Sequence, residues 1–267
     1  MASFREKGSG NLTHEELIKL IEERFPPSLS EEWDNSGLQV GPFEGEVKVV
    51  GLALNPSLFS IKSAIEKGCD FLLVHHPLIF PSIRRIDTST AIGKVIEVAF
   101  SHRITLYALH TPWDVTSGGS SDYWADLIGL GDRCPILPAR SDSKIGIGRI
   151  GRIESVSFDD MVSFLKRQVN FLLPVQVGRK EISKVAICSG SGGDLLDRVI
   201  ALGADLYITS DLKYHQVLKA LNAGVNLLIL SHHEMEERSL IYLERELKKL
   251  VFNIDLNLLK ERDPLLS

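Results

Sequence analysis

Two adjacent histidine pairs are the first feature of the sequence that points to chemistry. The chain has eight histidines, and four of them form the pairs His75-His76 and His232-His233. Each pair comes after an apolar run that is typical of a buried β-strand. Adjacent residues on a strand point to opposite faces, so both members of a pair can reach one site only where the strand ends. Imidazoles gathered at strand ends are typical ligands of zinc, iron, nickel or copper.

Carboxylates accompany both pairs. The segment 110–114 ends the next predicted strand and carries a histidine and an aspartate. After the second pair, His233 and Glu237 are four positions apart on a predicted helix, so they share one face. His232 and Glu236 have the same spacing, and spacing alone does not choose between the two registers. Either pair is able to chelate one metal ion or to link two.

Other readings of these polar residues stay open. His14 and His102 are isolated, and we expect them to be ordinary surface or core residues. The glutamates after the second pair could form a solvated first helical turn that the helix dipole favours. The run 189–193, SGSGG, lies between a predicted strand and a predicted helix. It could hold a phosphate on free backbone amides or simply form a tight turn, and it lacks a Walker lysine.

Composition narrows the class of protein. The 267 residues include 30 Lys and Arg against 35 Asp and Glu, which gives a net charge of −5 and argues against a nucleic-acid-binding protein. The hydrophobic fraction of 44% is enough for a packed core. Three cysteines with no CxxC exclude a disulfide scaffold and a thiolate zinc site, and favour a reducing compartment. We find no apolar run of membrane-spanning length and no signal peptide, so we expect a cytoplasmic protein.

The elements that must position these side chains alternate between helix and strand. Thr13 and Glu16 form a capping-box pattern that starts the first helix. The segment 30–41 is expected to be a loop or turn. Further helices are expected at 58–67, 90–101, 157–169, 195–202, 215–222 and 234–250, and strands at 47–54, 70–76, 104–110, 184–188, 205–209 and 226–230. This order predicts an α/β fold with mixed, largely parallel sheets.

The same pattern divides the chain. We expect an N-terminal α/β half at 11–130 with the HH and HxxxD motifs, a connecting segment at 131–182, and a C-terminal α/β half at 183–260 with the HxxxE motif. Both halves contain a helix, a glycine, a buried strand and then polar residues. This similarity indicates either two related halves or only the common way in which helices join strands.

Several motifs, taken together, resemble one known family. They are WDNSGLQVG (33–41), LLVHHPLIF (72–80), HTPWD (110–114), SGGSSD (117–122), CSGSGGDLL (188–196), YITSDLKYH (207–215) and HHEMEER (232–238). In this set and order they resemble the NIF-three-like family, the GTP cyclohydrolase I type 2 homologues.

The resemblance implies two interlinked α/β domains with a dinuclear metal site between them, and frequently a ring-shaped hexamer. The implied ligands are His75, His76, Asp114, His233 and Glu237. Glu237 would bridge two divalent ions, and the family's His-x-x-x-Glu-Arg ending favours this register over its neighbour. Zinc, iron, manganese and nickel all suit such ligands. Asn55 stands where the family usually has an aspartate, and His110 is implied to be a nearby polar group.

The expected function is that of a metal-dependent hydrolase acting on a small nucleotide-like or heterocyclic substrate. His110 and His215 would move protons. Trp33, Asn35 and Trp113 would line the pocket beside the metals, although each tryptophan could equally be a core or subunit-contact residue. The alternative is a protein without catalysis, which carries or inserts a metal or acts as a regulatory binding partner.

Overall fold

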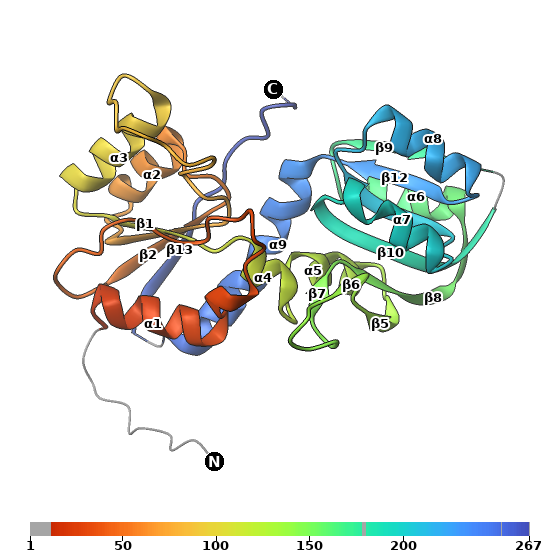
Figure 1. Ribbon diagram of the computed structural model, residues 1–267, viewed down its shortest axis with the longest axis horizontal. Coiled ribbons are helices and arrows are strands. Elements are labelled where there is room, and N and C mark those ends of the chain that lie inside the picture. The colour runs from red at the N-terminus through yellow and green to blue at the C-terminus, as the bar shows by residue number, and fades with distance from the viewer. Residues whose placement is uncertain (1–11, 178–179, 252, 267) are drawn as a thin grey trace, which may run out of the picture.

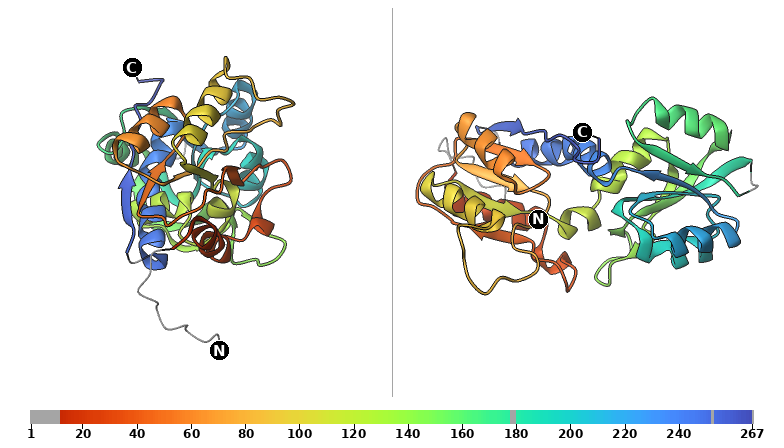
Figure 2. Two further views of the ribbon diagram at one scale, coloured as in Figure 1. Left: turned by 90° about the vertical axis from the view of Figure 1, so that its left-hand side faces the viewer. Right: turned by 90° about the horizontal axis from the view of Figure 1, so that it is seen from above.

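The computed structural model describes residues 12–177, 180–251 and 253–266. It contains two α/β halves, each built on its own sheet (Figure 1). The long helix α9 (His232–Leu250) runs between them, which the view from above shows clearly (Figure 2). The mixed α/β fold predicted from the sequence is confirmed.

The first sheet has five strands in the order β1-β4-β3-β2-β13. Its strands are β1 (Gly37–Val40), β2 (Val49–Ala53), β3 (Phe71–Val74), β4 (Thr105–Ala108) and β13 (Asp255–Leu258). All neighbours are parallel except β1, which pairs antiparallel with β4. Strand β1 lies within the segment 30–41, where the sequence indicated only a loop or turn. Strand β13 brings the end of the chain back to the first half.

The second sheet has six strands in the order β5-β8-β10-β11-β12-β9. Its strands are β5 (Gly131–Cys134), β8 (Arg149–Ser157), β9 (Leu172–Val175), β10 (Glu181–Ser191), β11 (Leu206–Ser210) and β12 (Asn226–Leu230). The central three, β10 to β12, are parallel, and β5, β8 and β9 are antiparallel to their neighbours. Three of the six strands thus come from the segment 131–182. The short strands β6 (Leu137–Pro138) and β7 (Gly146–Ile147) form a separate pair.

Helices cover both faces of each sheet. They are α1 (His14–Arg24), α2 (Leu58–Glu66), α3 (Ala91–Ser101), α4 (Thr111–Val115), α5 (Ser120–Leu127), α6 (Phe158–Lys166), α7 (Leu196–Ala201), α8 (Tyr214–Asn222) and α9, with single 3₁₀ turns at Pro27–Leu29 and Gly193–Leu195. Buried side chains of α1 and α9 pack on one face of the first sheet, and those of α2 and α3 pack on the other. In the second half α5, α6 and α9 cover one face, and α7 and α8 the other.

Side-chain caps fix where several helices begin. The capping box predicted for α1 is present, with Thr13 and Glu16 each bonding the backbone of the other. Ser157, the first residue of the helix predicted at 157–169, is the N-cap of α6 and accepts from the backbone N–H of Asp160. Such caps satisfy amides that the first helical turn leaves without a partner, and each typically contributes about 1 kcal/mol.

Helix α9 belongs to both halves. Its Met235 is buried in the core of the second half, whereas Leu240, Leu243 and Leu247 are buried in the core of the first. The helix begins at His232, two residues before the predicted start, because Ser231 takes the N-cap position and accepts from the backbone N–H of Glu234. The first turn of α9, with its histidines, is therefore held at the boundary between the halves.

Among the helices of the described residues, none is long and apolar enough to cross a membrane.

Candidate metal centre

Four imidazole rings meet at the boundary between the halves. His75 and His76 follow β3, His110 follows β4, and His232 opens α9 after β12. The ring centroids of His75 lie 4.9 Å from those of both His76 and His110, and the His76 and His232 centroids are 5.7 Å apart. His76 and His232 are 156 positions apart in the chain (232 − 76). The histidines that the sequence predicted at strand ends thus form one cluster.

Each of these rings is fixed through its Nδ1 atom. The acceptors are the Leu109 carbonyl for His75 (3.1 Å), the Asn55 side-chain oxygen for His76 (2.9 Å), Asp34 for His110 (2.8 Å) and Asp211 for His232. A carbonyl or carboxylate oxygen can only accept, so the hydrogen of each imidazole lies on Nδ1. The Nε2 atom keeps its lone pair in a neutral ring, and this is the tautomer that binds a metal through Nε2.

Two carboxylates face the Nε2 atoms. The Nε2 atom of His75 lies 3.8 Å from Asp114 Oδ2 and 3.7 Å from Glu236 Oε1. The other oxygen of Glu236, Oε2, lies 3.0 Å from His76 Nε2 and 2.9 Å from His232 Nε2. Glu236 therefore reaches histidines on two sides, one with each carboxylate oxygen.

The donor atoms fit a divalent metal. His75 Nε2 is buried, and no hydrogen bond reaches it from the described part of the chain. Buried polar atoms are normally satisfied by a partner, a water or an ion. The separations of 3.7 and 3.8 Å around His75 exceed a hydrogen bond. They are close to the roughly 3.4 Å between two ligands of one tetrahedral zinc, given metal–ligand bonds of about 2.0–2.1 Å.

The charges of the cluster favour a cation. Burial opposes protonation of His75, but Asp114 and Glu236 outweigh it and raise the pKa of this histidine to about 9. Burial likewise opposes protonation of His232, and Glu236 and Asp211 raise its pKa to about 9. Burial outweighs Glu236 at His76 and lowers the pKa of that ring. For Glu236 itself, the three histidines overcome burial and hold its pKa well below the usual value.

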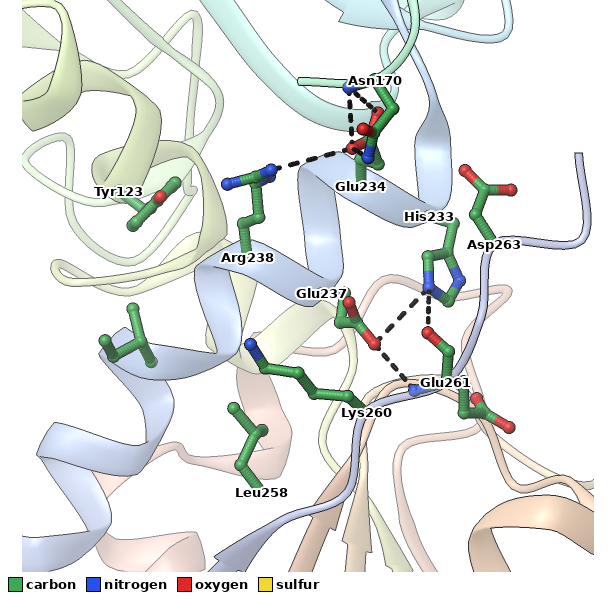
Figure 3. Close-up of a pocket in the computed structure, with 11 residues that line it drawn as sticks. Tyr123, Asn170, His233, Glu234, Glu237, Arg238, Leu258, Lys260, Glu261 and Asp263 are labelled. Carbon is green, nitrogen blue, oxygen red and sulfur yellow. Dashed lines mark hydrogen bonds and ion pairs between the residues drawn. The ribbon is translucent and has the colours of Figure 1, made fainter. Parts of the chain in front are cut away.

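The structure brings together a different register of α9 from the one expected. His233 and Glu237, the residues predicted from the resemblance, lie on another side of the helix, where His233 Nε2 is 3.5 Å from Glu237 Oε1 and 3.2 Å from the Glu261 carbonyl (Figure 3). Each residue advances about 100° around a helix. His232 and Glu236 take the face directed at the cluster, and His233 and Glu237, one position further on, are turned away from it.

Of the other predicted ligands and proton carriers, all but His215 lie at the cluster. His75, His76 and Asp114 are in the cluster, and Ser120 donates a short hydrogen bond to Asp114. His110 lines the same cavity. His215 is exposed on α8 and is not one of the residues that line the cavity.

Of the other three residues predicted for the pocket, Trp33 lines the cavity, and Trp113 and Asn35 do not. Trp33 is 56% exposed, and its ring lies 5.6 Å from that of His110 and 6.0 Å from that of Phe80. Trp113 is fully buried and packs edge-on against His75, so it is a core residue that supports the histidine. Asn35 donates to the Ile79 carbonyl at 2.7 Å and does not line the cavity.

A cavity of about 440 Å³ opens beside the cluster. Its walls are formed by Trp33, His76, Pro77, Phe80, His110, Thr111, Asp114, Ser120, Ser121, Ile147, Cys188, Ser189, Ser191, His232 and Glu236. Aromatic rings stand on the side of the first half, and small hydroxyl-bearing residues stand on the side of the second. No lysine or arginine is among these described residues.

The glycine-rich run 189–193 helps to build this wall. Gly190 has a positive φ of 74°, and a Cβ atom there would lie 2.2 Å from Glu236 Oε1. Only glycine therefore lets the end of β10 approach Glu236 this closely. Of the two readings of the run, the structure supports a tight strand end, because the helix that follows is a 3₁₀ turn and then six residues of α7.

Sequence reasoning missed the side chains that hold the histidines. Asp34, Asn55 and Asp211 are separated in the chain from their histidine partners by 76, 21 and 21 positions. Asp34 also accepts from Ser36 and Thr111, and these bonds with His110 outweigh burial and lower the pKa of Asp34. Asp34 and Asp211 lie in two of the motifs listed above, but only the folded chain shows which histidine each residue contacts.

Fold and site together define a two-sheet α/β protein with a histidine–carboxylate cluster between its halves. Residues 12–264 match the family described as Duf34/NIF3 (NGG1p interacting factor 3), and the chain belongs to this family.

Individual relatives agree with this assignment. The chain is 33% identical over 237 residues to the GTP cyclohydrolase 1 type 2 homolog of Clostridium perfringens, a match that covers 88% of this chain and 90% of that protein. It is 34% identical to the protein of the same name from Methanocaldococcus jannaschii, over 83% of this chain and 88% of that protein. Among solved structures, the Bacillus cereus protein related to NIF3 shares the fold, with a TM-score of 0.89, 22% identity, and coverage of 96% of this chain and 99% of that one.

Proposed function

We propose that the chain binds two divalent metal ions at the cluster. The proposed ligands are His75, His76, Asp114, His232 and Glu236. The observation that carries the proposal is the convergence of histidine Nε2 atoms on the two oxygens of the buried Glu236. Oε1 lies on the side of His75 and Asp114, and Oε2 on the side of His76 and His232. Glu236 would accordingly bridge the two ions, the role that the resemblance gave to Glu237.

The proposed activity is metal-dependent hydrolysis. Bound divalent ions lower the pKa of water and polarise an electrophile. His110 would carry the proton, because its ring lines the cavity and Asp34 holds its Nδ1 atom at 2.8 Å. His215 has no part in this proposal, since it is exposed and outside the cavity lining. The name of the relatives, GTP cyclohydrolase 1 type 2 homolog, supports a reaction that opens a heterocyclic ring.

The cavity favours a small heterocycle as the substrate. Its volume of about 440 Å³ suits a base or nucleoside, and the exposed ring of Trp33 offers a flat surface on which a heterocycle can stack. The described lining contains no lysine or arginine that would clamp a phosphate. We therefore expect the chain's own residues to recognise the ring, and the bound metal ions to make any contact with a phosphate group.

One observation favours the alternative of a metal carrier. The side chains of His76 and His232 are 26% and 30% exposed, so two proposed ligands are reachable from the cavity. A site that passes its metal to a partner needs such access. A closed homo-oligomer, the hexamer that the resemblance implies, is a further part of the proposal that light scattering would test.

The test compares two neighbouring glutamates. Protein purified without added metal would be analysed for metal content and assayed on a panel of bases, nucleosides and nucleotides, before and after metal depletion. Glu236→Gln should lose most of the bound metal, because the amide has one acceptor oxygen and no charge. Glu237→Gln is the matched control and should keep it. Equal metal content in both variants would contradict the site.

Turnover separates the two functions. Metal-dependent turnover of any member of the panel that Glu236→Gln abolishes would support hydrolysis. Stable metal binding without turnover, together with transfer of the metal to an apo-acceptor chelator, would support the carrier.

A further inference from the structure

The C-terminal segment passes α9 on the side that carries His233 and Glu237 (Figure 3). The backbone of Glu261 contacts two side chains of α9. Its N–H donates to Glu237 Oε1 at 2.8 Å, and its carbonyl lies 3.2 Å from His233 Nε2 (Figure 3). Two residues on, the buried carboxylate of Asp263 accepts from Ser231, the N-cap of α9. The position of Glu261 is thus fixed by the helix that carries His232 and Glu236.

The side chain of Glu261 reaches the first half of the molecule. Its Oε2 accepts from Asn55 Nδ2 at 2.9 Å, and its Oε1 accepts from the Ser57 hydroxyl. The other end of the Asn55 amide, Oδ1, contacts His76 Nδ1 at 2.9 Å. A continuous chain of hydrogen bonds therefore runs from Glu261 through Asn55 to His76, across 206 positions of sequence.

The hydrogen bonds from Glu261 through Asn55 to His76 allow only one orientation of the Asn55 amide. A carboxylate is an acceptor, so the NH₂ group of Asn55 must face Glu261. The amide oxygen must then face His76, so the ring carries a hydrogen on Nδ1. Its Nε2 atom, 3.0 Å from Glu236 Oε2, is then the atom available to a metal. If the amide turned over, its NH₂ group would face Nδ1, the hydrogen would move to Nε2, and His76 could not bind a metal through that atom.

The other histidines of the cluster do not share this ambiguity. The Nδ1 atoms of His110 and His232 contact carboxylates, and that of His75 contacts a backbone carbonyl. None of these acceptors can present a hydrogen by turning over. His76 alone among the four depends on an amide, and hence on whatever fixes that amide.

We propose that Glu261 is a positioning residue for the metal site, which sets the tautomer of His76 by fixing the amide of Asn55. This inference rests on the proposed metal binding for its consequence, but the tautomer itself is a property of the metal-free protein. It makes the C-terminal segment part of the site although Glu261 touches neither the cavity nor a proposed ligand oxygen.

The first experiment uses Glu261→Ala, with Arg262→Ala as the control. Arg262 is exposed and adjacent, and the substitution at 261 leaves the backbone contacts to α9 available. Two quantities would be measured in full-length protein: the ¹⁵N shifts of the His76 ring without metal, and zinc affinity by competition with a chromophoric chelator. Wild type and Arg262→Ala should show hydrogen on Nδ1. Glu261→Ala should show a mixture of tautomers and bind zinc about 10–100-fold more weakly, as is usual when the outer partner of a ligand is lost.

An exchange of the amide and the carboxylate between positions 55 and 261 separates the proposed role of Glu261 from a general loss of structure. Asn55→Asp alone places two carboxylates side by side and should weaken zinc binding. Asn55→Asp combined with Glu261→Gln restores one donor facing one acceptor, so the double variant should recover the Nδ1 tautomer and much of the affinity. An unchanged His76 tautomer in Glu261→Ala would overturn the proposal, as would a double variant no better than Asn55→Asp. If wild type bound no zinc, the metal-site proposal would fail, and the tautomer measurement would still decide the role of Glu261.

Discussion

Gly190 and Glu236 stand so close that a Cβ atom on residue 190 would lie 2.2 Å from the Oε1 atom of the glutamate. The end of β10, where residue 190 is a glycine, thus lies directly against the Glu236 carboxylate, which contacts histidines with both of its oxygens. This contact fixes Glu236 from one side, while His75, His76 and His232 surround it from the others.

Gly190→Ala should therefore expel metal by displacing Glu236. Gly203→Ala is the matched control, because Gly203 has a similar φ of 69° but open space where its Cβ would lie. Both variants should lose about 1–2 kcal/mol of unfolding free energy from the positive φ. Only Gly190→Ala should also lose metal, measured by elemental analysis after gel filtration. Full metal content in Gly190→Ala would show that Glu236 is not held by this contact.

Asp211 should control the metal affinity of His232. Asp211 adopts a positive φ of 52°, a costly conformation for a residue with a side chain, and its carboxylate contacts His232 Nδ1. Asp211→Asn keeps an acceptor oxygen and should weaken zinc binding only slightly, whereas Asp211→Ala should weaken it about 10–100-fold.

Asp132 offers the control for backbone strain. It is exposed on β5 with a φ of 46°, and it does not line the cavity. Asp132→Ala should change thermal stability to a similar degree as Asp211→Ala and leave zinc affinity unaltered. Similar affinities for the two alanine variants would remove Asp211 from the site.

The sequence was informative where one local pattern decides the outcome. The unbroken apolar run of β3, whose four residues are fully buried, places His75 and His76 at a strand end. The α9 register was not decidable in this way, because His-x-x-x-Glu occurs twice with a shift of one residue. It depends on how α9 packs between the halves, with Met235 buried in one core and Leu240 in the other. The hydrogen-bonded partners Asp34 and Glu261 were out of reach because 76 and 206 positions separate them from the groups they hold.

Metal binding should strengthen as pH rises from 6 to 9. His75 and His232 have pKa values raised from 6.5 to about 9, so both are protonated in the metal-free protein at neutral pH. A metal must displace these protons, and each proton released makes affinity rise about tenfold per pH unit below the pKa. Titration calorimetry in buffers of different ionisation enthalpy would count the protons. Release of none at pH 7 would contradict the assignment of these two ligands.

Stability without metal should follow the opposite trend. A histidine whose folded pKa is raised stabilises the fold below its unfolded pKa, near 6.5, and this contribution is lost as pH rises through about 9. The melting temperature of metal-free protein should accordingly fall between pH 6.5 and 9. The metal-loaded protein should show a smaller fall, because the ion replaces the protons. Parallel thermal melts across this range would check both, and a metal-free protein that gained stability with pH would show that the carboxylates do not dominate the site.

The two tryptophans near the cluster should behave as different kinds of residue. Trp113 is fully buried against His75, so Trp113→Ala should cost about 3–5 kcal/mol of unfolding free energy and disturb the metal as well.

Trp33 is 56% exposed at the cavity, beside Phe80 and His110. Trp33→Ala should leave stability within about 1 kcal/mol of wild type and metal content unchanged. It should weaken the binding of a heterocyclic ligand, such as a purine base, by roughly tenfold, in keeping with the usual worth of a stacking contact. Trp33→Phe keeps a flat ring and should recover part of that loss. Ligand affinity measured by calorimetry on the metal-loaded protein would separate these outcomes, and equal affinities for wild type and Trp33→Ala would mean that the ligand does not stack at the cavity mouth.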